Sequence, residues 1–422
     1  MAAPVRRRAR GGGRAGDALR PPGATHDTAK HRHKKVRSRD EFVALLEREI
    51  ADPCGRVLVL HGGGGFGKTT LALEAARLAS ARGTQVWWIS ASDRTRLNAG
   101  MREVALRLGI PTAEIDHAWS GRASAPDLLW RHLRRSGRRW ILLIDDANEP
   151  QSLADPDQRL CDGTGWLRPP PGGRGTVVVT SRDGNRFAWG DFSWLHRVES
   201  LDAVSGGKAL LDLTGDGAGT EADARRLSAQ LGGLPLALHI AGTYLAYSAH
   251  APSVPGTTVP RTFPCYGSAL EQQFATTIDR LPPGDRQPRA ENGIVTRTWE
   301  LSLDLLARQG FPRARSLMRF LACFAQAPVP YGILDVREMR PIAAFGDLTP
   351  EELLELLHLL ADFGLVDCFE DRVLQSHALT LHPLVRETNL HHLTRPEVTR
   401  LFLEFDHSRS YLELHRYAHD WR

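Results

Sequence analysis

A glycine-rich loop followed by Lys-Thr is the feature that most constrains how this chain can fold. The stretch His61–Thr70 reads HGGGGFGKTT, and Gly62 and Gly67 fill the two glycine positions of the pattern G-x-x-x-x-G-K-[ST]. The apolar run Val57–Leu60 before it predicts a buried strand, and residues 71–79 carry apolar side chains at helical spacing. A flexible loop with a chance Lys-Thr is the alternative. The strand before it and the helix after it favour a phosphate-binding loop.

Each residue type in this loop suits phosphate binding. Glycines have no Cβ atom, so the backbone can curl around a phosphate and aim its N–H groups inward. The N-terminus of the following helix adds a positive dipole at the same point. Lys68 is expected to reach the β- and γ-phosphates, and the Thr69 hydroxyl is expected to bind Mg²⁺. The predicted nucleotide-binding residues of the loop are Gly62, Gly64, Gly65, Phe66, Gly67, Lys68, Thr69 and Thr70.

Composition is that of a globular protein with apolar residues for several cores. The chain has 422 residues, of which 42% are hydrophobic and 24% are charged. No stretch approaches the length of continuous apolar sequence that a membrane-spanning helix needs, so no membrane association is expected. The five cysteines are scattered and show no zinc-like spacing. Unpaired cysteines favour a reducing compartment, and we therefore expect a cytoplasmic protein.

The basic character of the chain is concentrated at its start. Residues 1–35 are rich in Arg, Lys, Gly, Ala and Pro and hold only two Asp, so they cannot bury a core and are predicted to be disordered. No apolar run typical of a secretory signal is present there. We interpret residues 1–35 as a solvated tail. Three alternatives remain open: an organellar presequence, a misassigned start codon and a nucleic-acid-binding arm. Without this segment the chain is nearly neutral, which argues against nucleic acid as a partner.

Strands and helices alternate through the first half of the chain. Further strands are predicted at Gln85–Ser90, Arg139–Asp146 and Gly175–Arg182, and helices at Thr95–Leu108 and Ala125–Arg135. The strands are continuous apolar runs, as expected when a sheet is covered on both faces. This alternation predicts an α/β fold with a doubly wound, mainly parallel sheet of the P-loop NTPase type.

The second half of the chain is predicted to be mainly helical. A loop is expected over Ser248–Pro264 and another connection over Leu281–Asn292. From about Gly293, three helices followed by two short strands form a pattern typical of a winged helix. The predicted domains are a basic tail (1–35), a nucleotide-binding domain (36–202), a helical domain with linker (203–292), a winged-helix domain (293–393) and a helical C-terminal stub (394–422).

Polar side chains end two of the predicted strands. Asp145 and Asp146 end the strand that begins near Arg139, and Arg182 ends the strand that begins at Gly175. In a P-loop protein, Asp145 would hold Mg²⁺ opposite Thr69, and Asp146 would orient or deprotonate the attacking water. A guanidinium at Arg182 could recognise a γ-phosphate. The alternatives are that the two carboxylates only cap a strand and that Arg182 is a surface residue. Lys68, Asp145, Asp146 and Arg182 are the predicted catalytic residues.

Several motifs occur in one order that resembles the NB-ARC/STAND class of signal-transducing ATPases, as found in actinobacterial regulators. The segment Val36–Glu41 looks like the family's opening V-G-R-x-x-E motif, and Gly62–Thr70 is similar to its P-loop. The other matching segments are Trp88–Ser90 on the second strand, Leu142–Asp146 as Walker B, Thr180–Arg182 as the sensor strand, Gly233–Leu236 as GLPL and Leu381–Arg386 as MHD. The P-loop alone indicates only NTP binding, whereas the ordered set is specific.

The resemblance implies further site residues and a switch. Val36 and Arg39 would contact the nucleotide, Pro235 would pack near the adenine and ribose, and His382 would contact the β-phosphate of ADP. Position alone gives Pro235 and His382 no chemistry. In the family, ADP holds the nucleotide-binding, helical and winged-helix domains closed. ATP exchange releases the winged helix and permits oligomerisation, and hydrolysis is slow.

This chain departs from the family pattern at four places. Ser38 stands where a Gly is usual, and Phe66 replaces a smaller aliphatic residue in the P-loop. Pro383 replaces the Asp of MHD, which leaves His382 alone in the latching role. The family also carries an effector domain before the ATPase core and a sensor of repeats after it. The resemblance implies ATP or ADP with Mg²⁺ as ligands, self-association in the ATP state, and a separate protein partner that supplies the sensor or effector.

Two other functions remain open. A winged-helix DNA-binding regulator with an ATPase core is the main alternative, although the helix expected over Thr349–Phe363 is acidic and a groove-binding helix should carry Lys or Arg. A metabolic P-loop enzyme such as a kinase is the other alternative, but no pocket for an acceptor substrate is evident. We therefore expect an ADP/ATP-binding molecular switch with at most slow ATPase activity.

Overall fold

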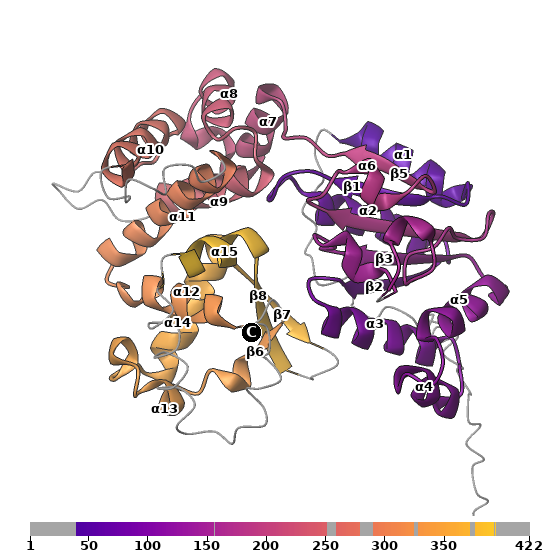
Figure 1. Ribbon diagram of the computed structural model, residues 1–422. Coiled ribbons are helices and arrows are strands. Elements are labelled where there is room, and N and C mark those ends of the chain that lie inside the picture. The colour runs from indigo at the N-terminus through magenta and orange to yellow at the C-terminus, as the bar shows by residue number, and fades with distance from the viewer. Residues whose placement is uncertain are drawn as a thin grey trace, which may run out of the picture.

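The computed structural model describes residues 39–155, 157–250, 259–278, 290–324, 328–371, 376–391 and 393. The predicted basic tail, Val36 and the predicted C-terminal stub lie outside the described residues. In Figure 1 the strands β1 to β5 with α1 to α6 form one half of the molecule, and α7 to α15 form the other half. We call residues 39–202 the P-loop part, residues 203–308 the helical part and residues 313–391 the C-terminal part.

The P-loop part is built on a five-stranded sheet with the order β2-β3-β4-β1-β5, and all of its pairings are parallel. The register places Leu60 beside Thr180 and Ser90 beside Asp145, so the polar ends of neighbouring strands meet at one edge. The predicted fold class is confirmed. The strands are β1 (Val57–His61), β2 (Gln85–Ser90), β3 (Trp140–Asp145), β4 (Gly175–Ser181) and β5 (Ser193–Arg197).

Apolar residues alternate between the two faces of the sheet. Leu58 and Leu60 pack with α1 (Asp40–Ala51) and α2 (Lys68–Ala81), whereas Val57 and Val59 belong to the core on the other face. Period-two alternation of strand side chains gives both faces a core, which is why the strands are apolar throughout. The helices of the second face are α3 (Arg94–Arg107), α4 (Thr112–Trp119) and α5 (Ala125–Arg135), and a short helix α6 (Arg186–Trp189) precedes β5.

The helical part consists of five helices around a core that continues into the C-terminal part. The prediction of a loop up to Pro264 was wrong at its end, because the next helix already begins at Phe263, whose buried ring belongs to this core. The connection predicted to end at Asn292 likewise gives way to a helix that starts at Ala290. The helices are α7 (Ala203–Thr214), α8 (Glu221–Gln230), α9 (Pro235–His250), α10 (Phe263–Ile278) and α11 (Ala290–Arg308).

The C-terminal part combines helices with a three-stranded antiparallel sheet of order β6-β8-β7 and has the predicted winged-helix character. Strand β6 is only two residues long and was not predicted. Its elements are α12 (Arg313–Cys323), β6 (Val329–Pro330), α13 (Val336–Met339), α14 (Pro350–Asp362), β7 (Val366–Asp371), β8 (Ser376–Leu381) and α15 (Pro383–His391). Short 3₁₀ turns lie at Pro150–Leu153, Leu160–Asp162, Gly215–Ala218, Tyr331–Ile333 and Ala343–Phe345.

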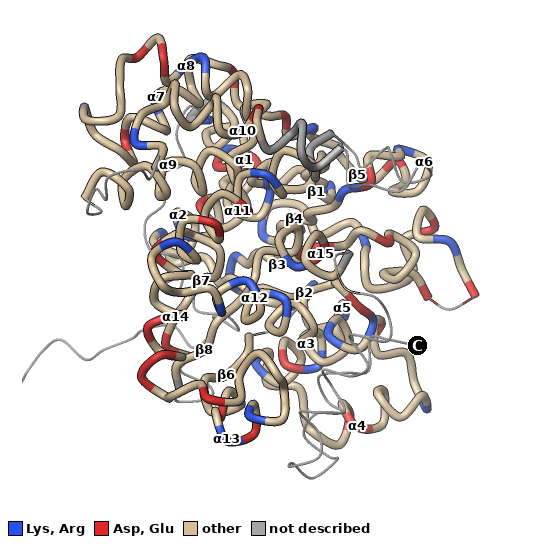
Figure 2. Tube along the Cα trace, turned by 90° about the vertical axis from the view of Figure 1, so that its left-hand side faces the viewer, with Lys and Arg blue, Asp and Glu red and all other residues tan. Residues whose placement is uncertain are grey.

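Among the residues that the structure describes, no helix has both the length and the apolar character needed to cross a membrane. Figure 2 shows basic and acidic residues distributed over all three parts.

Candidate functional site

The loop between β1 and α2 has a backbone that requires glycine. Gly62, Gly65 and Gly67 have φ angles of 152°, 77° and 82°, in the region that side chains with a Cβ rarely adopt. A Cβ atom on Gly62 would also lie 2.3 Å from the carbonyl oxygen of Val198. Sequence and conformation therefore agree on a curled loop.

Lys68 is the first residue of α2 and lies against the loop. Its Nζ donates to the carbonyl oxygens of Gly62 at 2.9 Å and Gly63 at 2.8 Å. Because α2 begins at Lys68, directly after the loop, its N-terminus lies at the loop, where the helix dipole favours an anion. Thr70 is exposed on the first turn of α2. Phe66 contacts the core between the sheet and α1–α2 and also the core of the helical and C-terminal parts.

Asp145 lies beside the start of α2 at the end of β3. Its Oδ1 accepts hydrogen bonds from the Thr69 hydroxyl, at 2.9 Å, and from the Thr180 hydroxyl. Burial raises the pKa of Asp145 to about 6, and the neighbouring Asp146 charge adds to the rise. The hydrogen bonds from the two hydroxyls and the positive charge of Lys68 lower the pKa and partly offset the rise. An ionised carboxylate here is therefore costly without a cation.

Asp146 adopts a left-handed conformation with φ of 62°, the only non-glycine residue with positive φ among those described. Its backbone N–H donates to Thr180 Oγ1 at 2.9 Å. Its Oδ1 accepts from Asn148 Nδ2 at 2.6 Å, and Asn148 Oδ1 accepts from the backbone N–H of Arg182 at 2.8 Å. Several hydrogen bonds therefore fix both the backbone and the carboxylate of Asp146.

The side chain of Arg182 extends from the end of β4 to the C-terminal part. Its Nη1 lies 2.9 Å from Glu387 Oε2 on α15. Both side chains are partly exposed, at 25% and 39% of their surface. The structure therefore pairs the predicted phosphate-sensing guanidinium with a carboxylate of another part of the chain.

Arg39 lies at the other side of the loop. Its guanidinium donates to the carbonyl oxygen of Glu199, and burial lowers the pKa of Arg39. The neighbouring residue Val198 donates its N–H to the carbonyl of His61 at 2.7 Å and contacts Gly62 through its own carbonyl. Arg39 is thus tied to the segment that packs beneath the loop.

The GLPL segment of the helical part contacts the loop directly. The backbone N–H of Leu236 donates to the carbonyl oxygen of Gly65 at 3.4 Å. A Cβ placed on Gly67 would lie 3.9 Å from Pro235 Cγ, so the proline ring lies next to this glycine. The predicted position of Pro235 at the loop is consistent with this packing.

The start of α15 reaches the loop from the C-terminal part. Methyl carbons of Leu384 lie 3.4 Å from a Cβ position on Gly64 and 3.5 Å from one on Gly65. His382 precedes the helix, and its Nδ1 accepts the backbone N–H of Leu384 at 3.1 Å. His382 therefore caps the helix α15, whose first turn carries Leu384 to the glycines.

The structure brings every described residue of the predicted site to this one region, with Thr70 on its outside. Sequence reasoning missed the polar residues Asn148, Thr180 and Glu387 and the apolar contacts Leu236 and Leu384. Thr180 could have been assigned to the site, since it belongs to the Thr180–Arg182 motif at the end of a strand that must flank Asp145. No sequence signal pairs Arg182 with Glu387, 205 residues away.

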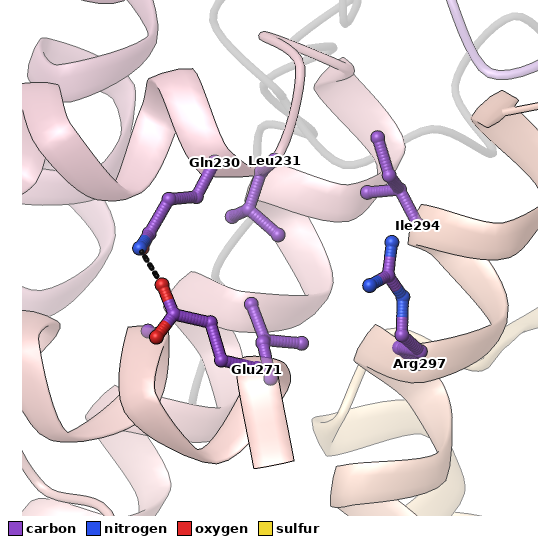
Figure 3. Close-up of a pocket in the computed structure, with 7 residues that line it drawn as sticks. Gln230, Leu231, Glu271, Ile294 and Arg297 are labelled. Carbon is purple, nitrogen blue, oxygen red and sulfur yellow. Dashed lines mark hydrogen bonds between the residues drawn. The ribbon is translucent and has the colours of Figure 1, made fainter. Parts of the chain in front are cut away.

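A separate hollow of about 140 Å³ lies between α8, α10 and α11 and contains none of the predicted site residues (Figure 3). Gln230 donates to Glu271 Oε1 at 2.9 Å on one side of it, and Arg297 lies on the other side.

The residues present suit a nucleotide with Mg²⁺. The loop holds three glycines at positive φ, a Cβ at Gly62 would clash with the Val198 carbonyl, and Lys68 lies against the loop, which suits a phosphate-binding cradle. Thr69 and Asp145 supply hydroxyl and carboxylate oxygens beside it, which are the donors that Mg²⁺ prefers.

Comparisons with known proteins agree with this geometry. The family model described as "NB-ARC domain" matches residues 40–202. A comparison with curated proteins finds no match. Among solved structures, the chain is similar to a STAND protein with a tetratricopeptide repeat sensor from Pyrococcus horikoshii, at 15% identity and a TM-score of 0.50. The match covers 90% of this chain but only 46% of that chain, so this chain spans less than half the length of that protein.

Two other solved structures have lower TM-scores. The Orc1 protein of Aeropyrum pernix in complex with DNA has 15% identity, a TM-score of 0.35 and coverage of 87% of this chain and 94% of that chain. A Walker-type ATPase of Pyrococcus abyssi has 14% identity, a TM-score of 0.35 and coverage of 85% and 97%. The domain match covers residues 40–202, and the STAND protein shares the fold of the chain. Residues 40–202 of this chain form an NB-ARC domain, and the resemblance to the NB-ARC/STAND ATPases is confirmed.

Proposed function

We propose that this protein is an ADP/ATP-binding molecular switch that signals by nucleotide-dependent rearrangement of its domains. One observation carries the proposal: Leu236 of the helical part and Leu384 of the C-terminal part both contact the glycine loop of the P-loop part. A ligand on that loop adjoins all three parts and can bias their arrangement. We further propose domain limits at 36–202, 203–292 and 293–393.

The loop residues have distinct proposed roles. The backbone N–H groups of the glycine loop and Lys68 bind the phosphates, and Thr69 with Asp145 holds Mg²⁺. Bound Mg²⁺ would neutralise phosphate charge. Asp146, oriented by Asn148, positions or deprotonates a water for slow hydrolysis of ATP.

The residues around the loop distinguish ADP from ATP. Arg182 pairs with Glu387 in this closed arrangement, and a γ-phosphate is a competing partner for its guanidinium. Pro235 packs beside the base and ribose, and Arg39 belongs to the same pocket. His382, at the start of α15, contacts the β-phosphate of ADP. Release of α15 would expose surface for self-association, and a separate protein supplies the sensor or effector.

Identification of the bound nucleotide tests this function. Purified protein is denatured, and the released nucleotide is identified by chromatography. We expect close to one ADP per chain from the wild type and none from Lys68→Ala, because Lys68 is the one lysine on the loop. Lys208→Ala is the matched control, since Lys208 is exposed on α7 and distant in sequence from the loop.

The outcomes separate clearly. ADP in the wild type and the control but not in Lys68→Ala supports a switch that is closed at rest. If the wild type carries no nucleotide, micromolar ADP and ATP are added and binding is measured by calorimetry. Absence of binding to both would overturn the proposed function.

The DNA-binding alternative gains no support from the structure. Helix α14, the recognition-helix candidate of the winged helix, carries Glu351 and Glu352 in its first turn, and Figure 2 shows acidic residues along it. Arg313 pairs with Glu352 at 2.8 Å and is thereby engaged inside the C-terminal part. A DNA backbone would meet negative charge on this helix.

A further inference from the structure

Asn148 uses both ends of its side-chain amide in the candidate site. Its Nδ2 donates to Asp146 Oδ1 at 2.6 Å, and its Oδ1 accepts the backbone N–H of Arg182 at 2.8 Å. The orientation of the amide is fixed by its partners, because a backbone N–H can only donate and an ionised carboxylate can only accept. A flipped amide would lose both hydrogen bonds.

The two partners of Asn148 belong to different strands. Asp146 follows β3 and Arg182 follows β4, and neighbouring parallel strands meet here at the edge that faces the glycine loop. The backbone N–H of Asn148 also donates to the carbonyl of Asp146 at 2.9 Å, which closes the turn that holds Asp146 at positive φ. One side chain therefore holds the two chemically active groups in a fixed relation.

We propose that Asn148 is a positioning residue that orients Asp146 and Arg182 together toward the third phosphate of ATP. The inference rests on the proposed nucleotide-binding function. Arg182 can leave Glu387 for a phosphate only by rotating about a backbone that Asn148 holds in place. ADP lacks the third phosphate, and its own phosphates lie on the glycine loop and Lys68. Loss of Asn148 therefore affects ATP binding and leaves ADP binding nearly unchanged.

Asn148→Leu tests this role, because leucine has a similar volume and can make neither hydrogen bond. Affinities for Mg-ATP and Mg-ADP are measured by calorimetry on the full chain. We expect ATP binding to weaken about tenfold, the effect of one hydrogen bond to a charged group, with ADP binding within about twofold of the wild type. Asn185→Ala is the matched control, since Asn185 accepts the N–H of Phe187 at 3.1 Å on an exposed turn.

Asn148→Asp tests the contact with Asp146 by itself and keeps the acceptor for Arg182. An ionised carboxylate at position 148 would repel Asp146, whereas the Asn148 amide donates to it at 2.6 Å. ATP binding should therefore weaken at least as much as in Asn148→Leu, with ADP binding within about twofold of the wild type.

Each result has one meaning. Equal losses of ATP and ADP affinity in Asn148→Leu or Asn148→Asp, or no loss of either, would show that Asn148 only supports the fold. Wild-type protein that binds neither nucleotide would instead remove the proposed function itself. Selective weakening of ATP with a normal Asn185→Ala control supports the inference.

Discussion

Asp145 is the residue whose charge state most affects this site. Its carboxyl is buried beside Asp146 and accepts two hydroxyl hydrogen bonds, and burial raises its pKa to about 6. In the unfolded chain an aspartate has a pKa of about 4. Between these values the folded protein binds a proton that the unfolded chain has lost, so the free energy of unfolding falls as pH rises through this window.

We expect Asp145→Asn to remove this pH dependence. The amide oxygen can still accept from Thr69 and Thr180, but the side chain carries no charge. Without Mg²⁺ at pH 7, the variant should be more stable than the wild type by about 2–3 kcal/mol, the equivalent of a pKa shift of about two units. Urea unfolding at pH 4 to 8 measures the difference.

The control for this prediction is Asp191→Asn, because Asp191 is exposed and its charge should matter little. Parallel pH profiles for the wild type and Asp145→Asn would contradict the prediction. Mg²⁺ should also reverse the order of stability when nucleotide is present, because only the wild type has a carboxylate for the cation.

Asp146 has a strained, left-handed backbone conformation, and hydrogen bonds with Asn148 and Thr180 stabilise this conformation. Asn tolerates the left-handed region better than other non-glycine residues, whereas Ala does not and also loses the bond to Asn148. We expect Asp146→Asn to unfold like the wild type and Asp146→Ala to be less stable by about 1–2 kcal/mol. Both variants should bind ADP, and both should lose ATP turnover in a single-turnover assay.

Stability that is equal in Asp146→Asn and Asp146→Ala would mean that the positive φ is not what matters at this position. Retained turnover in Asp146→Asn would exclude a role for the carboxylate in handling water.

Residue-level prediction from the sequence is possible where local chemistry decides. The glycines and Lys68 could be named because a left-handed backbone and a phosphate partner require particular residue types at fixed spacing. Asn148 was missed because its hydrogen bond goes to Arg182, 34 positions later in the chain. Val36 lies outside the described residues, so its contact with the nucleotide stays a prediction.

At the scale of elements, buried regular segments were predictable and exposed or very short ones were not. Strands β1 to β4 are apolar runs, and each was predicted within a few residues. Strand β5, at one edge of the sheet, was missed because Trp194 and Arg197 are exposed and no apolar run forms. Strand β6 is too short to show a period, and α4 carries few apolar residues.

The glycine loop is also a packing element, because Phe66 contacts two cores. Phe66→Ala should therefore lower stability and loosen the contact between the P-loop part and the rest of the chain. We expect a loss of about 1–3 kcal/mol for a partly buried phenylalanine, measured by urea unfolding. Phe187→Ala is the control, since Phe187 is 85% exposed and its removal should cost little.

A Phe66→Ala protein that is as stable as Phe187→Ala would show that the loop does not join the two cores energetically. Phe66→Leu should restore part of the stability, because the leucine side chain keeps apolar contact with both cores.

At the scale of the whole molecule, the parts meet at the loop through few polar contacts. The pair of Arg182 and Glu387 joins the P-loop part to α15 at 2.9 Å. Because both side chains are partly exposed, solvent screens this pair, and it contributes at most about 1 kcal/mol. A contact of this strength can hold a closed arrangement and still yield to a phosphate, which offers Arg182 a more highly charged partner.

Glu387→Gln should therefore weaken closure without unfolding the protein. The amide keeps the shape of the side chain but loses the charge, so the ADP-bound state loses one of its links to α15. We expect ADP to dissociate about two to five times faster, measured by stopped-flow displacement of a fluorescent ADP analogue, because up to about 1 kcal/mol of closure is lost.

Glu221→Gln is the matched control: Glu221 pairs with Arg225 within α8 and joins no two parts. At high salt the wild-type rate should rise toward that of Glu387→Gln, since salt screens the pair in the wild type and has little effect on the variant, which lacks it. Unchanged ADP release in Glu387→Gln would assign closure to the apolar contacts of Leu236 and Leu384 alone, and the switch would then depend on packing rather than on charge.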